Sequence, residues 1–575
     1  MDAQRLLRFE SFELDVRSRE LRKGKQRIRL QEQPFEILRL MLERPGDVVT
    51  REELARHLWP QGTFVDFEHS LNAAVKRLRA ALGDDADNPR FVETLPRRGY
   101  RFIASLRDGE TVAVLPVVSD YKARLAVLPF ANLSGDPAQE YFSDGLTEEM
   151  TLQLGRLGRG RIAVISRSSS NAFKGSGRRA REIGEILRAD YLLEGSVRRE
   201  ADRVRITAQL VETRSEAHLW TDAYERSLTD CLSVQAEVAA RIARSLAVEL
   251  LPEQPVQPSR DPAAYQTYLK GRYYWNLQGD QGLPQAIEYF KQACESDPTF
   301  AAAHADLART HTARAEYYNL LPRTALELAR PIAERALELD PHLAQAHLAV
   351  ANVRAMLDWD WEGAEVGFRQ AIALNPSSDG AHRWYGLLLA GLGRSSEAIR
   401  EAQRAHELDP LCLVTGTGAA WTQYMAGEYQ PAIDTCRIVM DMQGSFAPAW
   451  RVLAASLIQM GRVAEGVAEL ETAAVTSTDP VLLAWLAHAK AIRGECGVAR
   501  TILKALEGLR QERFVPAYHL ALAQVGLGDA DEAFRQLDLA CEERDPALIN
   551  LNLDPRFDPI RGDGRFAVLL ERVRL

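Results

Sequence analysis

The sequence lacks the features of a secreted or membrane-spanning protein. Its six cysteines are scattered, without a C-x-x-C pair or histidines at metal-ligand spacing, so they predict reduced thiols and no metal site. The stretch MDAQRLLRFESFELDVRSRE has no apolar core of the signal-peptide kind. The longest apolar runs, at 111–118 and 124–130, fall far short of the ~20 residues of a membrane span. These absences predict a cytoplasmic protein without a membrane partner.

Motifs of nucleotide chemistry are also missing. The sequence contains neither GxxxxGK[ST] nor GxGxxG, which gives nucleotide hydrolysis and dinucleotide binding no support. Asp144, Glu148 and Glu149 could be imagined as paired carboxylates, but capping and the helix dipole favour acids at a predicted helix start. The sequence therefore predicts no catalytic residue, no cofactor and no enzyme.

Length and charge predict several domains of unequal character. The 575 residues are too many for one hydrophobic core, and 46% apolar and 26% charged residues are typical of folded chains. Residues 1–107 carry 21 Lys and Arg against 17 Asp and Glu, whereas the remainder has a net charge of −13. The basic segment SLNAAVKRLRAAL, residues 70–82, lies in this positive region.

The first hundred residues predict small strands, three helices and a terminal hairpin. Short apolar alternations break at 23–25, as antiparallel strands and a turn require. One helix ends at Pro45, and the next begins with Thr50 and Glu53 at capping-box spacing. The basic segment forms the third helix, and residues 96–99 turn a hairpin with a basic tip.

The basic helix has two predicted faces. Leu71, Val75, Leu78 and Leu82 form one stripe that should be buried. A helix of ~10–12 Å diameter fits the major groove of DNA, so the opposite face and the hairpin tip predict the DNA contacts. The predicted DNA-binding residues are His69, Asn72, Ala73, Lys76, Arg77, Arg79, Arg97 and Arg98. An ordinary solvated basic face is the alternative, and for His69 a loop histidine without a role.

The order of these elements resembles the OmpR/PhoB-type winged helix-turn-helix of transcriptional regulators. The resemblance covers roughly residues 8–104 and rests on GDVVTREELARHLWP, VDFEHSLNAAVKRLRAALGDD and FVETLPRRGYRF, whose tip is similar to the ToxR/CadC-like branch. It implies promoter DNA as partner, with the hairpin arginines on a backbone or minor groove, and dimerisation or tandem sites. It also implies a loop that can meet RNA polymerase, although a plain connection is the alternative. The loop residues are Trp59, Thr63, Phe64 and Asp66.

Residues 124–250 predict a central α/β domain with a mixed sheet. Apolar strands, amphipathic helices and a hairpin over 190–213 alternate, and a helix is expected over 233–250. The segments YFSDGLTEE, LLEGSVR and LWTDAYER resemble the TolB amino-terminal-like domain. The serine-rich segment 166–179 is expected to be a flexible loop, with an anion site before the next helix as the alternative.

Residues 263–546 repeat with a step of about 34 residues, marked by Asp-Pro or Asn-Pro pairs. Small residues at helix crossings and proline after each second helix resemble the tetratricopeptide repeat, in about eight units. Such repeats stack into an α-solenoid with a concave groove, which predicts a protein or peptide ligand. The tryptophans of this region could line the groove, or could be packing residues.

The sequence thus predicts a multidomain, mostly α protein. Its parts are a winged helix-turn-helix at 1–107, a linker at 108–123, the α/β domain at 124–250, a proline-rich linker at 251–262, the repeats at 263–546 and a cap at 547–575. The favoured function is a one-component DNA-binding transcriptional regulator whose other domains act as sensor or protein-interaction modules. The alternative is a repeat scaffold or adaptor without sequence-specific DNA binding.

Overall fold

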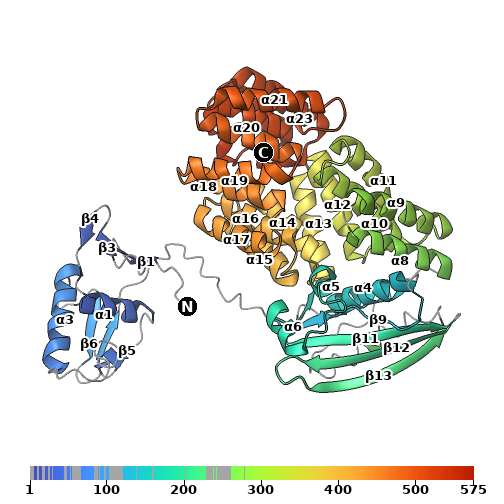
Figure 1. The fold of residues 1–575 in the computed structure, drawn as a ribbon, viewed down its shortest axis with the longest axis horizontal. Coiled ribbons are helices and arrows are strands. Elements are labelled where there is room, and N and C mark those ends of the chain that lie inside the picture. Colours follow the sequence, from blue (N-terminus) through green and yellow to red (C-terminus); the bar gives the residue numbers. More distant parts are fainter. Residues whose placement is uncertain are drawn as a thin grey trace. The chain divides into compact units, whose positions relative to one another are not determined.

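The computed structural model forms two compact units, Met1–Ser119 and Asp120–Leu575 (Figure 1). The residues that it describes are 6–9, 12–15, 20–23, 26–28, 30, 32–43, 48–51, 53–54, 67–82, 84, 89, 91–95, 99–102, 121–136, 139–157, 161–200, 203–227, 237–238, 241, 261–277 and 279–575. No helix among these residues is both long and apolar enough to cross a membrane.

The amino-terminal unit contains two small antiparallel sheets, with strand orders β1-β2-β3-β4 and β5-β7-β6. The strands are β1 (Leu6–Phe9), β2 (Phe12–Asp15), β3 (Glu20–Lys23), β4 (Gln26–Ile28), β5 (Val48–Thr50), β6 (Val92–Leu95) and β7 (Gly99–Phe102). Gly99 pairs with Thr50, and a Cβ at Gly99 would lie only 2.1 Å from the carbonyl oxygen of Val49. Glycine therefore allows the terminal hairpin to approach β5.

Two long helices, α1 (Glu32–Glu43) and α3 (Phe67–Leu82), complete this unit, and Arg51, Glu53 and Leu54 are helical between them. The predicted capping box is confirmed. The Thr50 amide donates to the Glu53 carboxylate at 2.8 Å, and the Glu53 amide donates to the Thr50 hydroxyl at 3.2 Å. One hydrophobic core joins both helices to the strands, with Phe35, Leu38, Leu78 and Phe102 among its buried side chains.

The second unit begins with a mixed sheet of order β10-β8-β11-β12-β13, in which β9 also pairs with β11. Its strands are β8 (Ala123–Val127), β9 (Ala131–Asn132), β10 (Ile162–Ile165), β11 (Tyr191–Glu200), β12 (Arg203–Glu212) and β13 (His218–Ser227). Strands β10, β8 and β11 are parallel, and β11, β12 and β13 are antiparallel, which confirms the predicted mixed sheet. β13 was not predicted as a strand, because its sequence mixes charged and apolar residues. Of the helix predicted over 233–250, only three residues are described, all helical.

The helices α4 (Glu140–Leu157) and α5 (Arg167–Asn171) lie between this sheet and the carboxyl-terminal helices, and α6 (Ala180–Leu187) also packs on β11 (Figure 1). The expectation of a flexible serine-rich loop over 166–179 is wrong for its first residues. Ser168, Ser169 and Ser170 lie in α5, and Ser169 and Ser170 are fully buried. The hydroxyls of Ser168 and Ser169 donate to Asp409 of the repeats, a contact that composition does not reveal.

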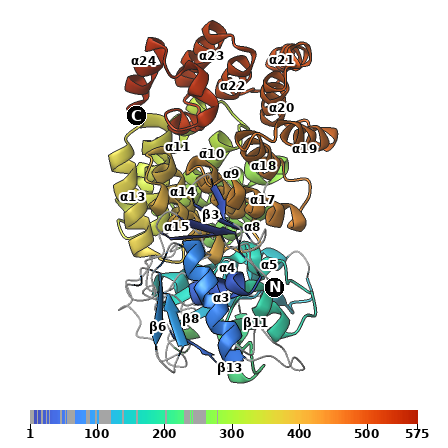
Figure 2. The ribbon, with the colours of Figure 1, turned by 90° about the vertical axis from the view of Figure 1, so that its left-hand side faces the viewer.

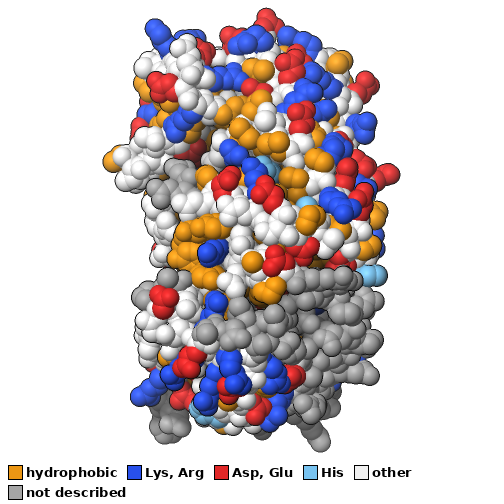
Figure 3. All heavy atoms as spheres, turned by 90° about the vertical axis from the view of Figure 1, so that its right-hand side faces the viewer, with side chains coloured by type: hydrophobic (Ala, Val, Ile, Leu, Met, Phe, Trp, Pro, Cys, Tyr) orange, Lys and Arg blue, Asp and Glu red, His pale blue; other side chains and the backbone are white. Residues whose placement is uncertain are grey.

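Paired helices make up the rest of the unit, and an Asp-Pro or Asn-Pro pair follows the second helix of several pairs. The pairs are α8 (Pro262–Leu277) with α9 (Gly279–Ser296), α10 (Ala301–Glu316) with α11 (Pro322–Leu339), α12 (Ala344–Val353) with α13 (Trp361–Leu374), α14 (Asp379–Gly391) with α15 (Ser395–Leu408), α16 (Leu413–Met425) with α17 (Tyr429–Met442), α18 (Ala447–Gln459) with α19 (Val463–Thr476), α20 (Pro480–Ile492) with α21 (Cys496–Leu509), and α22 (Ala517–Leu527) with α23 (Ala530–Glu543). This helical-repeat carboxyl-terminal part confirms the predicted fold class. On the face of the molecule in Figure 3, acidic and basic side chains intermingle with apolar ones.

The α/β segment and the repeats share one hydrophobic core. α4 packs on α8 so closely that a Cβ at Gly145 would lie 2.6 Å from Leu269. Beside this contact, the buried Arg272 guanidinium pairs with both Glu148 and Asp306. Burial alone would raise the pKa of Glu148, but Arg272 and Arg167 outweigh it and lower that pKa to about 2. Apolar packing and buried ion pairs therefore hold the α/β segment and the repeats together.

The carboxyl-terminal segment packs back on the paired helices. It comprises η4 (Pro546–Asn550), η5 (Pro555–Ile560) and α24 (Gly564–Val573), the last of which is labelled in Figure 2. The Arg556 guanidinium lies 3.6 Å from the ring centre of Trp485, and the indole of Trp361 donates to the Val573 carbonyl at 3.1 Å. Tyr318, from the connection between α10 and α11, donates to Asp545 at 2.8 Å. The surface predicted to hold a foreign peptide is thus covered in part by the chain itself.

Replacing Arg272 with methionine should destabilise the second unit strongly. The change removes the fully buried cation that Glu148 and Asp306 share and leaves each with only its second arginine, Arg167 or Arg309, which costs about 3–5 kcal/mol of unfolding free energy. The matched control is Arg323→Met, which breaks an ion pair with Glu327 whose side chains are about half exposed, and costs ~0–1 kcal/mol. Denaturant unfolding of the full chain measures both. Equal losses in the two variants would show that the buried pair does not fasten the segments.

Candidate nucleic-acid interface

Helix α3 presents one buried and one exposed face, as predicted. Leu71, Val75, Leu78 and Leu82 are each at most 3% exposed and pack into the core with α1 and the hairpin. On the other side Asn72, Lys76 and Arg77 are exposed. The helical spacing therefore fixes which side chains reach solvent, and the predicted orientation of this helix is confirmed.

Asn72 is held in place by two neighbouring elements. The Tyr100 hydroxyl of β7 donates to Asn72 Oδ1 at 2.8 Å, and Arg51 Nη1 donates to the same oxygen at 3.3 Å. The Arg51 guanidinium also lies 5.2 Å from the ring centre of Tyr100. An exposed amide that is fixed through its oxygen is preorganised for contact through its nitrogen, because its rotamer is already set.

Arg79, which the sequence predicts among the DNA contacts, forms hydrogen bonds within the amino-terminal unit. Its Nη2 donates to the Val92 carbonyl at 2.7 Å and to the Thr94 hydroxyl at 2.8 Å, both on β6. Just beyond the helix, the Asp84 carboxylate accepts from the backbone amides of Phe91 and Val92. Arg79 and Asp84 together join the end of α3 to the hairpin, so Arg79 acts as a positioning residue.

Several predicted site residues lie outside what the structure describes. The backbones of His69 and Ala73 are in α3, but their side chains are not described. The hairpin tip and the loop before α3 are likewise outside the described residues: Arg97, Arg98, Trp59, Thr63, Phe64 and Asp66. Their roles stay predictions.

The sequence did not point to Arg51 or Tyr100 as parts of this site. Arg51 directly follows the capping threonine, and Tyr100 directly follows Gly99, so both signals were available as neighbours of recognised motifs. The sequence did not reveal that β5 pairs with β7. This pairing brings the side chains of Arg51 and Tyr100 to α3. An exposed polar helix face, stiffened by a hairpin, is the geometry with which winged helices enter a DNA groove.

The comparison with known families agrees with this geometry. The family described as "Transcriptional regulatory protein, C terminal" matches residues 24–102, which include α1, α3 and the hairpin. Fold and family together define the class of the amino-terminal unit, a winged-helix domain of the kind that transcriptional regulators carry, and the carboxyl-terminal part of the chain is a helical-repeat module.

Three relatives are similar to parts of the chain, and two of them are named as transcriptional regulators. The transcriptional regulator HilA of Salmonella typhimurium is 23% identical over 427 residues, 74% of this chain and 74% of HilA. The cholera toxin homolog transcriptional activator of Vibrio parahaemolyticus is 37% identical over 83 residues, 14% of this chain and 28% of that protein. A Rhizobium meliloti protein whose provisional name is adenylate cyclase 3 is 37% identical over 235 residues, 40% of this chain. The chain spans only 40% of the length of that last relative.

Two solved structures give partial likenesses. The DNA-binding domain of Klebsiella pneumoniae RstA, solved with the RstA box, is 26% identical and covers 17% of this chain and 97% of its own, with a TM-score of 0.16. A tetratricopeptide repeat protein from Parabacteroides merdae is 17% identical and covers 47% of this chain and 100% of its own, with a TM-score of 0.35.

Arg79 and Lys76 offer a matched test of positioning against surface charge, because each variant removes one positive charge from α3. Arg79→Met should cost about 1.5–3 kcal/mol of stability in the amino-terminal unit, since two hydrogen bonds from a charged group are lost. Lys76→Met, at an exposed position, should stay within ~0.5 kcal/mol. Amide hydrogen exchange of α3 in the full chain measures both. Faster exchange in both variants, or in neither, would contradict the assignment of Arg79.

Proposed function

We propose that the chain is a one-component regulator in which the exposed face of α3 enters the major groove of promoter DNA. The single observation that carries the proposal is the exposure of Asn72, Lys76 and Arg77 above the buried leucine and valine stripe. Lysine and arginine can reach phosphates or guanine acceptors, and an asparagine amide can pair with adenine. Most of the relatives are named as transcriptional regulators, which supports the same conclusion.

We propose further that the second unit senses a signal and does not itself catalyse a reaction. Its α/β segment and repeats form one body, and at their junction Asp144, Glu148 and Asp306 pair with arginines while Asp409 accepts from a serine amide. The likeness of the α/β segment to TolB amino-terminal-like domains stays a prediction, as do dimerisation on DNA and the contact with RNA polymerase. A regulator of this kind works where the chromosome is, which supports the cytoplasm as its place of action.

We also propose that the repeats bind a protein ligand, but on a surface other than the groove that the sequence predicts. Trp421 and Trp485, which could have lined a peptide groove, face Arg556 of the chain's own carboxyl-terminal segment. A partner would therefore bind the surfaces that this segment and the α/β domain leave open, or would displace the segment.

Removing either charge on the exposed face should weaken promoter binding. Lys76→Ala or Arg77→Ala should cost about 1–3 kcal/mol in duplex affinity if the side chain reads a base, and should lower the salt slope if it meets a phosphate, by roughly 0.9 per contact. The control is Arg437→Ala, which removes an exposed charge from α17. Fluorescence anisotropy with promoter duplex over a range of salt concentrations measures all three. Unchanged affinity and slope in both α3 variants would favour the scaffold alternative.

A further inference from the structure

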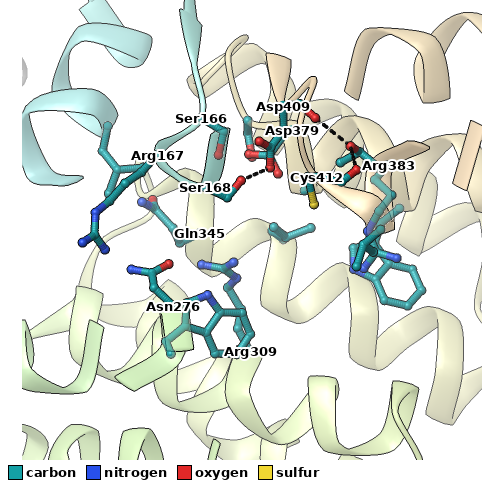
Figure 4. A pocket seen from close by; sticks show the side chains of 18 of the residues that line it. Ser166, Arg167, Ser168, Asn276, Arg309, Gln345, Asp379, Arg383, Asp409 and Cys412 are labelled. Carbon is teal, nitrogen blue, oxygen red and sulfur yellow. Dashed lines mark hydrogen bonds between the residues drawn. The ribbon is translucent and has the colours of Figure 1, made fainter. Parts of the chain in front are cut away.

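A polar cavity lies where the α/β segment meets the first helices of the repeats. One wall comes from α4 and α5, and the other from α8, α10, α12, α14 and α16 (Figure 4). Its volume is about 210 Å³, more than a single water needs and below the ~300–1,000 Å³ of sites for drug-sized ligands. Neither DNA binding nor the packing of the two segments uses this space.

The positive charges that line the cavity are already neutralised. Four arginines line it, and each pairs with carboxylates of the protein: Arg167 with Asp144 and Glu148, Arg272 with Glu148 and Asp306, Arg309 with Asp306, and Arg383 with Glu316. The lining therefore holds no spare cation among the described residues, and an anionic ligand would have to displace a carboxylate.

Two further carboxylates of the lining form no ion pair among the described residues, although the charges of Arg309 and Arg383 oppose the rise that burial causes in the pKa of Asp379. Asp379 and Asp409 lie side by side, and neither forms an ion pair with any Lys, Arg or His that the structure describes (Figure 4). Asp409 is 2% exposed, and its Oδ1 accepts from the amide and hydroxyl of Ser169 at 3.1 and 2.5 Å. Hydroxyl and amide donors ease the burial of a carboxylate but do not neutralise it.

Asp409 differs from the residues at the same position of other repeats, which accept a hydrogen bond within their own loop. At the equivalent places Asp340 and Asp479 accept from the amide two residues later, at 2.9 and 3.0 Å, and Asn375 does the same at 3.1 Å. At Asp409 that amide, of Leu411, donates instead to Ser169. The carboxylate is thus turned from its own loop to the α/β segment at the cavity.

Two buried acceptors point to a ligand that supplies hydrogen-bond donors. Asn352 is 3% exposed, and its Oδ1 has no partner among the described residues; the same holds for Gln345 Oε1, and both side chains line the cavity from α12. A buried acceptor without a donor costs ~1–3 kcal/mol. The lining donors in the same state are the Nε atoms of Arg167 and Arg272, which belong to the ion pairs already described.

We propose that this cavity binds a small organic cation with a primary ammonium group. The Asp379 and Asp409 carboxylates hold the ammonium, and the amide oxygens of Asn352 and Gln345 accept from further N–H or O–H groups of the ligand. Such a ligand touches α5 indirectly through Asp409 and the repeats directly, so its binding stabilises the junction of the two segments. The organic ammonium ligand is then the signal that the second unit senses.

Binding should release a proton. Burial and the neighbouring Asp379 raise the pKa of Asp409 to about 7, so the empty pair retains a proton near neutrality that an ammonium ion displaces. The other groups that face the pair do not supply this proton, because burial raises the pKa of the Cys412 thiol to about 12 and lowers that of His406. Arg309 and Arg383 are the guanidiniums that act on Asp379, and for Arg383 the ion pair with Glu316 outweighs burial and raises the pKa. Affinity should therefore rise as the pH increases from 6 to 8.

Isothermal titration calorimetry on the full chain tests the proposal, with butane-1,4-diamine and ethanolamine as probes. We expect one site per chain, and proton release that appears as a difference in heat between two buffers of unequal ionisation enthalpy. Succinate, a dianion of similar length to the diamine, should not bind. No heat and no thermal stabilisation with either amine would overturn the proposal, as would equal binding of succinate or of calcium chloride.

Asp409→Asn should weaken amine binding at least tenfold and abolish the proton release. Asn375 shows that asparagine is accepted at this repeat position, so the variant should fold, which its thermal transition verifies. Asp340→Asn is the matched control, because Asp340 occupies the same repeat position and bonds its own loop. Amine binding that is unchanged in Asp409→Asn, or equally weakened in Asp340→Asn, would overturn the assignment. The test involves no DNA, so it is independent of the proposed promoter binding.

Discussion

The burial of one stripe of α3 is the constraint on which the amino-terminal unit depends. Four aliphatic side chains at helical spacing leave water together, and each fully buried aliphatic side chain contributes roughly 1.5–3 kcal/mol. Rotating the helix to bury its basic face would forfeit that burial and would also bury unpaired charge. The exposed face is therefore determined by the hydrophobic effect, while the capping box, Arg79 and the β5–β7 pairing fix where the helix begins and how the hairpin stands beside it.

In the second unit, by contrast, buried charged side chains join the α/β segment to the repeats. Arg272 lies at the centre of a network that reaches from α4 to α10, and only mutual pairing makes such burial tolerable. The carboxyl-terminal segment then closes across the repeats through aromatic and arginine contacts. These contacts join the α/β segment, the repeats and the carboxyl-terminal segment into one body, and a polar cavity lies at the junction of the α/β segment and the repeats.

Much of the fold followed from local patterns in the sequence. Helical spacing located α3 and its buried stripe, Thr50 and Glu53 located the start of the second helix, and proline punctuation located the paired helices. Contacts between distant segments were not predictable, because no local pattern records them. The role of Arg79, the packing of Ser169 on Asp409 and the return of Arg556 to Trp485 each join residues far apart in the chain. The exposed side of α3, with Asn72, Lys76 and Arg77, was therefore predictable from the sequence, whereas its contacts with Arg51 and Tyr100 and the cavity were not.

The central claim is that this chain reads DNA sequence through the outward face of α3. Sequencing of genomic fragments captured by the intact chain tests it most directly. The account predicts that a short recurrent motif is enriched among the captured fragments, and that the enrichment is lost when Lys76 and Arg77 are both alanine. Capture without any shared motif, or a motif that survives the double substitution, would contradict it.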